Sequence, residues 1–163
     1  MPLQDPDVDR YRLVAKVVDF YPFEVKDAFY QKCSFCNKEI PKRQKACFKC
    51  GDSDYEFLQY CYQMFILIED EVGDQIKLSI NDKCSLFHEL KRAHLAEDSS
   101  ALRAFSARVN PLLGNLQAMH DGLEVGKIVE VENPQLCFEI DTWVFSEDAK
   151  LTRAFGLSAF AQI

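Results

Sequence analysis

The sequence predicts a mainly β protein, a small barrel of five strands that carries a metal-binding insertion. Three observations on the 163-residue chain lead to this prediction. Several segments are rich in β-branched and aromatic residues and alternate in polarity with the period of two that is typical of strands. Two helical segments stand together, between the third and fourth predicted strands. Two Cys-x2-Cys pairs lie early in the chain, between the first and second predicted strands.

Three strands are predicted ahead of the helical segments. Residues 11–20 form the first strand, and Pro22 ends it. The second strand covers residues 59–70, where both faces are largely apolar, so we expect it to be covered on both sides. A turn at Gly73 leads into the third strand, over residues 75–81.

Residues 83–94 are predicted as one helix, and a second helix begins with capping residues at 97–100. In the second helix Pro111 is expected to produce a kink or an early end. Its apolar residues recur at helical spacing and form one seam, made of Leu102, Phe105, Val109, Leu112 and Leu116. The seam either packs under the barrel or accepts a segment of a partner protein in helix-in-groove fashion, and the sequence is compatible with both.

The last part of the chain is predicted to contain two more strands and a final helix. Residues 121–122 mark a turn into a fourth strand over 123–131, and a fifth strand covers 135–145. Ser146 is then expected to cap a C-terminal helix. The helix is predicted because residues of its first turn are acidic and those of its later turns are basic, as the helix dipole favours. Five strands with a helical connection between the third and the fourth predict an OB-fold barrel. A generic small β-barrel with additional elements is the alternative.

The most specific signal is a set of four cysteines, Cys33, Cys36, Cys47 and Cys50. A spacer of two residues lets both thiolates of a pair reach one ion, and Zn²⁺ prefers four such tetrahedral donors. The spacing predicts one structural Zn²⁺ in a ribbon over residues 29–52, inserted in an OB-fold domain over residues 8–163. Four thiolates leave no position for an activated water. A disulfide pair or a redox Cys-x2-Cys is the alternative interpretation.

The net charge of −7 is unevenly distributed. Residues 32–49 hold six basic side chains and one acidic side chain, so the rest of the chain holds 13 basic and 25 acidic ones. Single-stranded nucleic acid binds along a basic track, which only the ribbon provides. The candidate phosphate contacts are Lys42, Arg43, Lys45 and Lys49. A solvated basic loop is the alternative.

Nothing in the sequence indicates an enzyme or a membrane protein. The histidines, His88, His94 and His120, fall in predicted helices outside any metal-protease pattern, and we expect surface or capping roles. No glycine-rich phosphate loop is present, so we expect no small-molecule substrate. No apolar run reaches the length of a membrane span. Seven cysteines indicate a reducing compartment, the cytoplasm or nucleus, with buried free thiols at Cys61, Cys84 and Cys137.

The chain resembles the C-terminal OB-fold and zinc-ribbon domain of the protection-of-telomeres protein family. The likeness rests on the opening segment 11–17 with Tyr21-Pro22, on the first cysteine pair, on the hairpin over 63–74, on 81–83, and on the closing strand over 136–142. It is also similar to the zinc-bearing OB domain of the replication protein A large subunit. Vertebrate members of the telomere family carry a resolvase-like domain between the cysteine pairs. Here only ten residues separate Cys36 from Cys47, so that domain is absent.

The telomere resemblance implies a docking domain for the bridging subunit of a telomere-capping, shelterin-like complex, in the nucleus at chromosome ends. The residues that we expect to contact this partner are Phe155, Leu157, Phe160, Leu102, Phe105 and Val109. Packing of these side chains on the core is the alternative. The replication protein A resemblance implies a single-stranded DNA-binding domain instead. Its stacking residues would be Phe29, Tyr30, Tyr55, Phe57, Tyr60 and Tyr62, and packing of these aromatic side chains in the core is the alternative.

Overall fold

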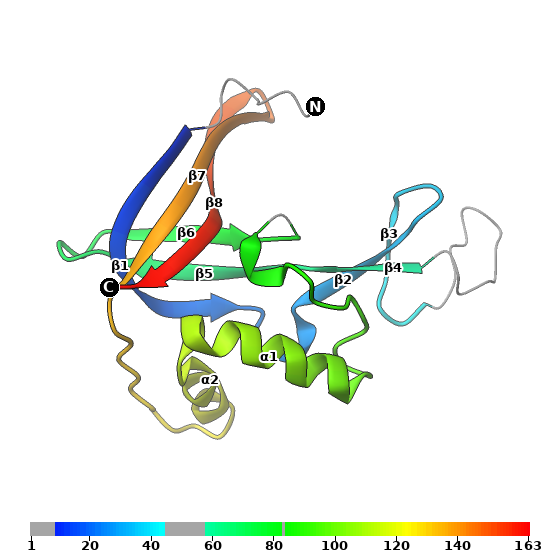
Figure 1. Ribbon diagram of the computed structural model, residues 1–163, viewed down its shortest axis with the longest axis horizontal. Helices are drawn as coiled ribbons and strands as arrows, with labels where there is room; N and C mark the ends of the chain where they lie inside the picture. The colour runs from blue at the N-terminus through cyan, green and yellow to red at the C-terminus, as the bar shows by residue number, and fades with distance from the viewer. Residues whose placement is uncertain (1–8, 45–57, 83) are drawn as a thin grey trace.

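The computed structural model describes residues 9–44, 58–82 and 84–163 (Figure 1). The barrel strands in these residues are β1 (Asp9–Tyr21), β5 (Met64–Glu69), β6 (Gln75–Ile80), β7 (Leu136–Glu147) and β8 (Lys150–Gln162). They close in the order β1-β5-β6-β8-β7, and β7 pairs back with β1. Within the described ranges, no helix is both long enough and apolar enough to cross a membrane.

β1 bends across the barrel, because its two halves have different partners. Residues 9–15 pair with β7, and residues 16–21 pair with β5. A register shift between Val17 and Asp19 marks the bulge that permits the bend. β6 and β8 meet in parallel at Ser79 and Gly156, while the other barrel neighbours are antiparallel. The mainly β class and the closed barrel predicted from the sequence are confirmed, and the architecture agrees with an OB-fold.

The barrel interior is filled by every second residue of its strands, as their alternating pattern predicts. The innermost side chains are Ala15, Val17, Met64, Ile66, Ile68, Leu78, Ile80, Leu136, Phe138, Ile140 and Leu157. The predicted strand over 59–70 is in fact two strands, because it is interrupted at Gln63. The second face of β5 carries Phe65 and Leu67, which are half-buried rather than covered.

Two helices, α1 (Ser99–Leu113) and α2 (Leu116–Glu124), connect β6 to β7 in the described chain. Asp98 caps α1, since its carboxylate accepts a hydrogen bond of 3.0 Å from Ala101 N–H. Pro111 lies in the last turn, and Gly114 ends the helix with φ of 58°. Phe105, Val109, Leu112 and Leu116 are at most 1% exposed and belong to the barrel core. The predicted seam therefore packs under the barrel (Figure 1).

The predicted helix over 83–94 is wrong. The described residues there form a single 3-10 turn, η3 (Ser85–Phe87), followed by a loop. Two arginine side chains donate hydrogen bonds to carbonyl oxygens of this loop. Arg92 donates to the carbonyl oxygens of Phe87 and Leu90, at 2.9 and 2.5 Å, and Arg108 donates to that of His88 at 2.9 Å. The turn buries Leu86 and Phe87 against the core.

The predicted strand over 123–131 is also wrong. Its first residues belong to α2, and the run over 125–135 pairs with no strand of the described chain. α2 continues because its inner face buries Leu116 and His120. Gly122 lies on that face against Val129, where an added methyl group would come within 2.6 Å of the valine side chain.

The predicted C-terminal helix is wrong as well, because residues 150–162 form β8. Asp148 and Ala149 adopt positive φ angles of 50° and 63° and make a two-residue hairpin between Glu147 and Lys150. The acidic and basic residues that suggested a helix are divided between the two sides of this turn. β8 is thus the fifth barrel strand, and β7 is the fourth.

Ala149 occupies a backbone conformation that favours glycine, so Ala149→Gly is expected to stabilise the hairpin. The left-handed conformation costs alanine about 1–2 kcal/mol, and glycine loses about 0.4–1 kcal/mol more chain entropy on folding. The net gain expected in the free energy of unfolding is roughly 0.5–1 kcal/mol. Urea denaturation followed by circular dichroism measures it. A decrease in stability would contradict the turn geometry.

A second sheet is inserted between β1 and β5. It follows the 3-10 turn η1 (Val25–Asp27) and contains β2 (Phe29–Cys33), β3 (Glu39–Ile40) and β4 (Leu58–Tyr62). The strand order is β3-β2-β4, with antiparallel pairs. In Figure 1 this sheet projects to the right of the barrel, while the β7-β8 hairpin projects upward.

Candidate functional site

The first cysteine pair lies on a tight turn at the end of β2. Asn37 N–H donates to the carbonyl oxygen of Cys33 at 2.8 Å, and Cys33 N–H donates to that of Lys38 at 2.9 Å. Asn37 has φ of 60°, a left-handed conformation that reverses the chain just after Cys36. Cys33 is buried and Cys36 is half-buried. The turn is compatible with the presentation of both thiolates to one ion.

The second pair, Cys47 and Cys50, lies outside the described residues, together with Lys45 and Lys49. Within the described residues, no cluster of three or more candidate metal ligands occurs. The zinc ligand set therefore stays a prediction. Elsewhere, Cys61 and Cys84 are buried, which raises the pKa of both thiols, and Cys137 is half-buried.

The side chain of Lys42 makes contacts within the protein. Its ammonium donates a hydrogen bond of 2.9 Å to the carbonyl oxygen of Asp27 and lies 4.2 Å from the ring centre of Phe29. Burial of the side chain lowers the pKa of Lys42. Arg43, next to it, is exposed to solvent. Of the two described candidates for phosphate contacts, Arg43 is thus the more accessible.

A groove with a volume of about 530 Å³ separates the end of β1 from the inserted sheet. Half of its lining residues are aromatic, and the lining is Tyr21, Pro22, Phe23, Asp27, Phe29, Tyr30, Glu39, Lys42, Gln63 and Phe65. Tyr21 is 65% exposed and Phe23 39% exposed. The rings of Tyr21 and Phe65 lie 6.3 Å apart, and the ammonium of Lys77 lies 4.6 Å from the ring centre of Phe65.

His120 fixes the segment that forms one wall of this groove. Its ring is stacked between Phe20 and Phe23, at centroid distances of 4.2 and 4.7 Å. Nδ1 lies 2.6 Å from the carbonyl oxygen of Phe23, and Nε2 lies 2.7 Å from a carboxylate oxygen of Asp19. From the same helix, Gln117 accepts a hydrogen bond of 3.1 Å from Val25 N–H. α2 thus holds residues 19–25 in place.

The surface or capping role predicted for the histidines is wrong for His120, which is only 4% exposed. His94 lies in the loop before α1, with its ring 4.5 Å from that of Phe29 and 6.1 Å from that of Tyr60. His88 is exposed, as expected. Tertiary packing decides the environments of these histidines, and a lone histidine in the sequence does not predict that packing.

We expect His120→Ala to lower the free energy of unfolding by about 2–3 kcal/mol, because it removes two stacked contacts and two hydrogen bonds. His88→Ala is the matched control, since its side chain is exposed. Thermal denaturation of both variants measures the difference. Equal midpoints for the two variants would show that the clamp on residues 19–25 contributes nothing to stability.

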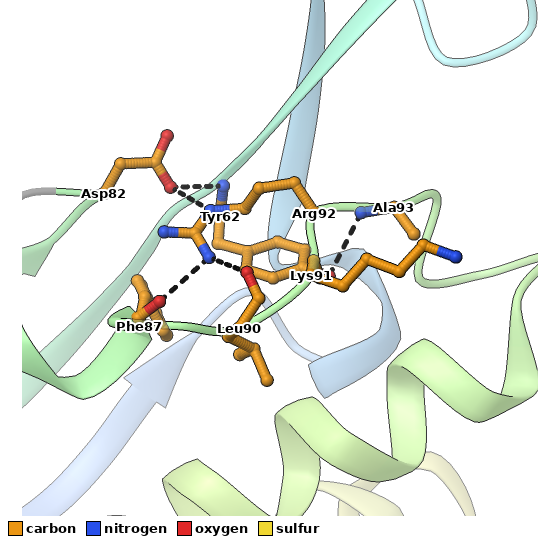
Figure 2. A network of polar contacts seen from close by, with 7 residues as sticks. All are labelled: Tyr62, Asp82, Phe87, Leu90, Lys91, Arg92 and Ala93. Atoms are coloured by element: carbon orange, nitrogen blue, oxygen red, sulfur yellow. Dashed lines mark hydrogen bonds and ion pairs between the residues drawn. The ribbon is translucent and has the colours of Figure 1, made fainter.

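Tyr62, one of the predicted stacking residues, is instead part of the core, and Figure 2 shows its polar contacts. It is fully buried, and its hydroxyl donates to the carbonyl oxygen of Lys91 at 2.6 Å and accepts from Ala93 N–H at 3.1 Å. Burial raises the pKa of Tyr62. Arg92 lies over the ring and pairs with Asp82 at 2.8 Å. This network ties the loop before α1 to β4.

The other predicted stacking residues are placed differently from one another. Phe29 is buried, whereas Tyr30 and Tyr60 are half-buried. Burial, together with a hydrogen bond to Cys61, raises the pKa of Tyr30 to about 12. Tyr55 and Phe57 lie outside the described residues. Of this set, Phe29 and Tyr30 line the groove, beside Tyr21, Phe23 and Phe65, which the sequence did not single out.

Half of the predicted partner-contact residues are interior. Phe105 and Val109 are fully buried, and Leu157 is 5% exposed. Leu102, Phe155 and Phe160 are partly buried and pack against the core. These six side chains stabilise the barrel. In this structure the three buried ones have no free surface for a partner.

Comparisons with known proteins identify relatives by structure but not by sequence. No protein family matches the sequence, and no curated protein matches it. The fold is similar to a chain in the crystal structure of fission yeast Pot1 and Tpz1, with a TM-score of 0.66 and 14% identity. That match covers 94% of this chain and 82% of the other.

A second similarity is to a replication protein A heterotrimer bound to single-stranded DNA, with a TM-score of 0.51 and 20% identity. It covers 96% of this chain and 32% of that one. At these identities the likeness concerns the fold. The resemblance inferred from the sequence is thus confirmed at the level of the fold: this chain is similar to a chain of the fission yeast Pot1 and Tpz1 structure and to replication protein A.

Proposed function

We propose that this chain is the C-terminal domain of a telomere end-protection protein, and that it docks the bridging subunit of a telomere-capping complex at chromosome ends. The observation that carries the proposal is the fold similarity to a chain of the Pot1 and Tpz1 structure, over 94% of this chain and 82% of that one. The net charge of −7 supports protein docking over DNA binding, because an acidic body repels phosphates. The role is non-enzymatic.

We also propose that one structural Zn²⁺ is held by Cys33, Cys36, Cys47 and Cys50. The turn geometry of the first pair, closed by two backbone hydrogen bonds, supports this assignment. Among its described residues, the inserted sheet has a small apolar cluster of its own, with Cys33 and Ile40 buried and Cys36 and Leu58 packed against them. A domain with so small a core is ordinarily stabilised by a metal or by disulfides.

Isothermal titration calorimetry of the zinc-loaded chain with the bridging subunit from the same species tests the docking proposal. We expect a complex with one subunit per chain and a Kd in the micromolar range or tighter, about −8 kcal/mol or below. The chain unfolded in urea and then diluted serves as a control for folding. An absence of binding by folded chain, judged by its circular dichroism spectrum, would refute the proposal.

The second candidate function is single-stranded DNA binding. The aromatic groove favours it, since exposed rings of Tyr21 and Phe23 next to Phe65, Lys42 and Lys77 resemble a stacking platform with a cation at its side. If this function holds, Tyr21→Ala with Phe65→Ala will weaken oligonucleotide binding at all salt concentrations. Removal of Lys42, Arg43 and Lys45 will flatten its salt dependence.

A further inference from the structure

The run between α2 and β7 has the sequence and burial pattern of a strand. Residues 127–132 read Lys-Ile-Val-Glu-Val-Glu, which combines β-branched residues with a period of two. Ile128, Glu130 and Glu132 are exposed, whereas Val129 and Val131 are half-buried. This alternation is expected of an extended chain that lays one face on the body of the protein.

No strand of the described chain pairs with this run, and no backbone–backbone hydrogen bond joins residues 128–135 to the rest of the described chain. Figure 1 shows the run outside the barrel strands, leading from α2 to the start of β7. An extended segment without a ladder presents unpaired N–H and C=O groups, which are a template for another strand. Its sequence favours a sheet that this chain alone does not provide.

Side chains hold the run in place from its inner face. The amide of Asn133 donates to the carbonyl oxygens of Leu113 and Val17, at 2.9 and 3.3 Å. At the other end, the side chain of Val129 lies against Gly122. The run is therefore fixed in position although its backbone is unpaired from Ile128 onward, so an incoming strand would have little of it to order.

The outer face of the run is apolar and acidic. Ile128 is 89% exposed, and it stands beside Glu130 and Glu132. The carboxylate of Glu132 lies 4.0 Å from the ammonium of Lys16, and its side chain remains 87% exposed. The complementary segment would carry lysine or arginine at alternate positions, on the face that meets the glutamates, and the alkyl stems of these side chains would contact Ile128.

We infer that residues 127–132 are a docking strand, which pairs through its backbone with an extended, basic segment of a protein partner. This mode is strand addition, in which main-chain hydrogen bonds give affinity and alternate side chains give specificity. The inference rests on the proposed docking function and names the surface and the chemistry of the partner segment. It also accounts for a strand-like sequence that remains unpaired in the single chain.

The test uses the full ¹⁵N-labelled chain and three synthetic peptides. Val-Lys-Val-Lys-Val-Lys is the probe, the same peptide with glutamate for lysine tests charge, and one with a central proline tests backbone pairing. We expect only the first to shift the amide signals of residues 127–132 and to slow their hydrogen exchange by about tenfold or more. Signals that shift elsewhere, equal binding of the proline peptide, or no shift at saturating peptide would each overturn the inference.

Three variants make the test specific. Glu130→Lys with Glu132→Lys is expected to weaken binding of the lysine peptide by at least about tenfold. Glu147→Lys with Asp148→Lys makes the same change of charge at the β7-β8 hairpin and is expected to change it by less than about twofold. Glu130→Pro removes one N–H that the fold leaves unpaired, so it should abolish binding while the rest of the amide spectrum is retained.

Binding of the bridging subunit distinguishes a failure of this inference from a failure of the proposed function. If the subunit binds the native chain and the Glu130→Lys, Glu132→Lys variant equally well, the docking strand is refuted and the docking function stands. If the lysine peptide binds the run but the subunit does not bind the chain, the proposed function is refuted and the strand-docking site stands.

Discussion

Replacement of Cys33 by serine is expected to unfold the inserted sheet and to lower the stability of the barrel. Structural zinc sites bind with about 10–16 kcal/mol at neutral pH, and this free energy is folding free energy for the part that holds the ion. β4 leads into β5 after one residue, and Tyr62 at its end ties the loop before α1. Loss of the insertion should therefore spread to the barrel. Zinc content by mass spectrometry, together with thermal denaturation, measures both effects.

Cys137→Ser is the matched control, because Cys137 lies in β7, away from the insertion, and is half-buried. It should retain one zinc per chain and a midpoint near that of the native protein. Treatment of the native chain with a chelator should lower its thermal midpoint to that of Cys33→Ser. Added zinc should restore the native midpoint. A fully folded, metal-free Cys33→Ser variant would contradict the structural role of zinc.

Phe105→Ala is expected to lower the free energy of unfolding by about 3–5 kcal/mol, as large-to-small core substitutions of phenylalanine do. The ring is fully buried, at the contact of α1 with the barrel. Its centroid lies 4.9 Å from that of Tyr62 in an edge-on arrangement and 5.3 Å from that of Phe87. The substitution would leave a cavity beneath the barrel, and both aromatic contacts would be lost.

Urea denaturation of Phe105→Ala gives this free energy, and Arg103→Ala on the exposed side of the same helix serves as control. The control should change stability by less than about 0.5 kcal/mol. If Phe105→Ala costs under about 1 kcal/mol, the seam of α1 does not pack against the barrel.

The barrel was predictable where one strand face is apolar and the other is not. β1, β6 and β7 show this alternation in sequence, so their positions were predicted to within a few residues. The helix seam was predictable for the same reason, because residues 105, 109 and 112 share one face of a helix that rests on the core. In both cases the local period and the tertiary environment agree.

The last strand was not predicted, because its turn contains no glycine. Asp148 and Ala149 adopt positive φ angles, and their residue types did not distinguish a two-residue hairpin from the start of a helix. The strand prediction for the run over 127–132 failed for the opposite reason. Its strand-like pattern is present, but the sheet that would complete it is absent from the described chain. Tertiary pairing decides both cases.

The candidate site likewise contains some features that the sequence predicts and others that it does not. The cysteine pairs predict a metal site by their spacing, because two ligands of one ion must lie a fixed number of residues apart in the chain. The environment of His120 is different, because it brings α2 together with residues 19–23, about a hundred positions earlier in the sequence. Only the folded chain creates that contact, and the groove that it supports was therefore missed.

The central claim, that this domain docks protein rather than DNA, is tested most directly by fluorescence anisotropy of a labelled G-rich telomeric oligonucleotide. The zinc-loaded chain is titrated into it at two salt concentrations, and a labelled bridging subunit is titrated in parallel. We predict saturable binding of the subunit and little or no binding of the oligonucleotide. Tight, salt-sensitive binding of the oligonucleotide without binding of the subunit would contradict the claim and assign function to the aromatic groove.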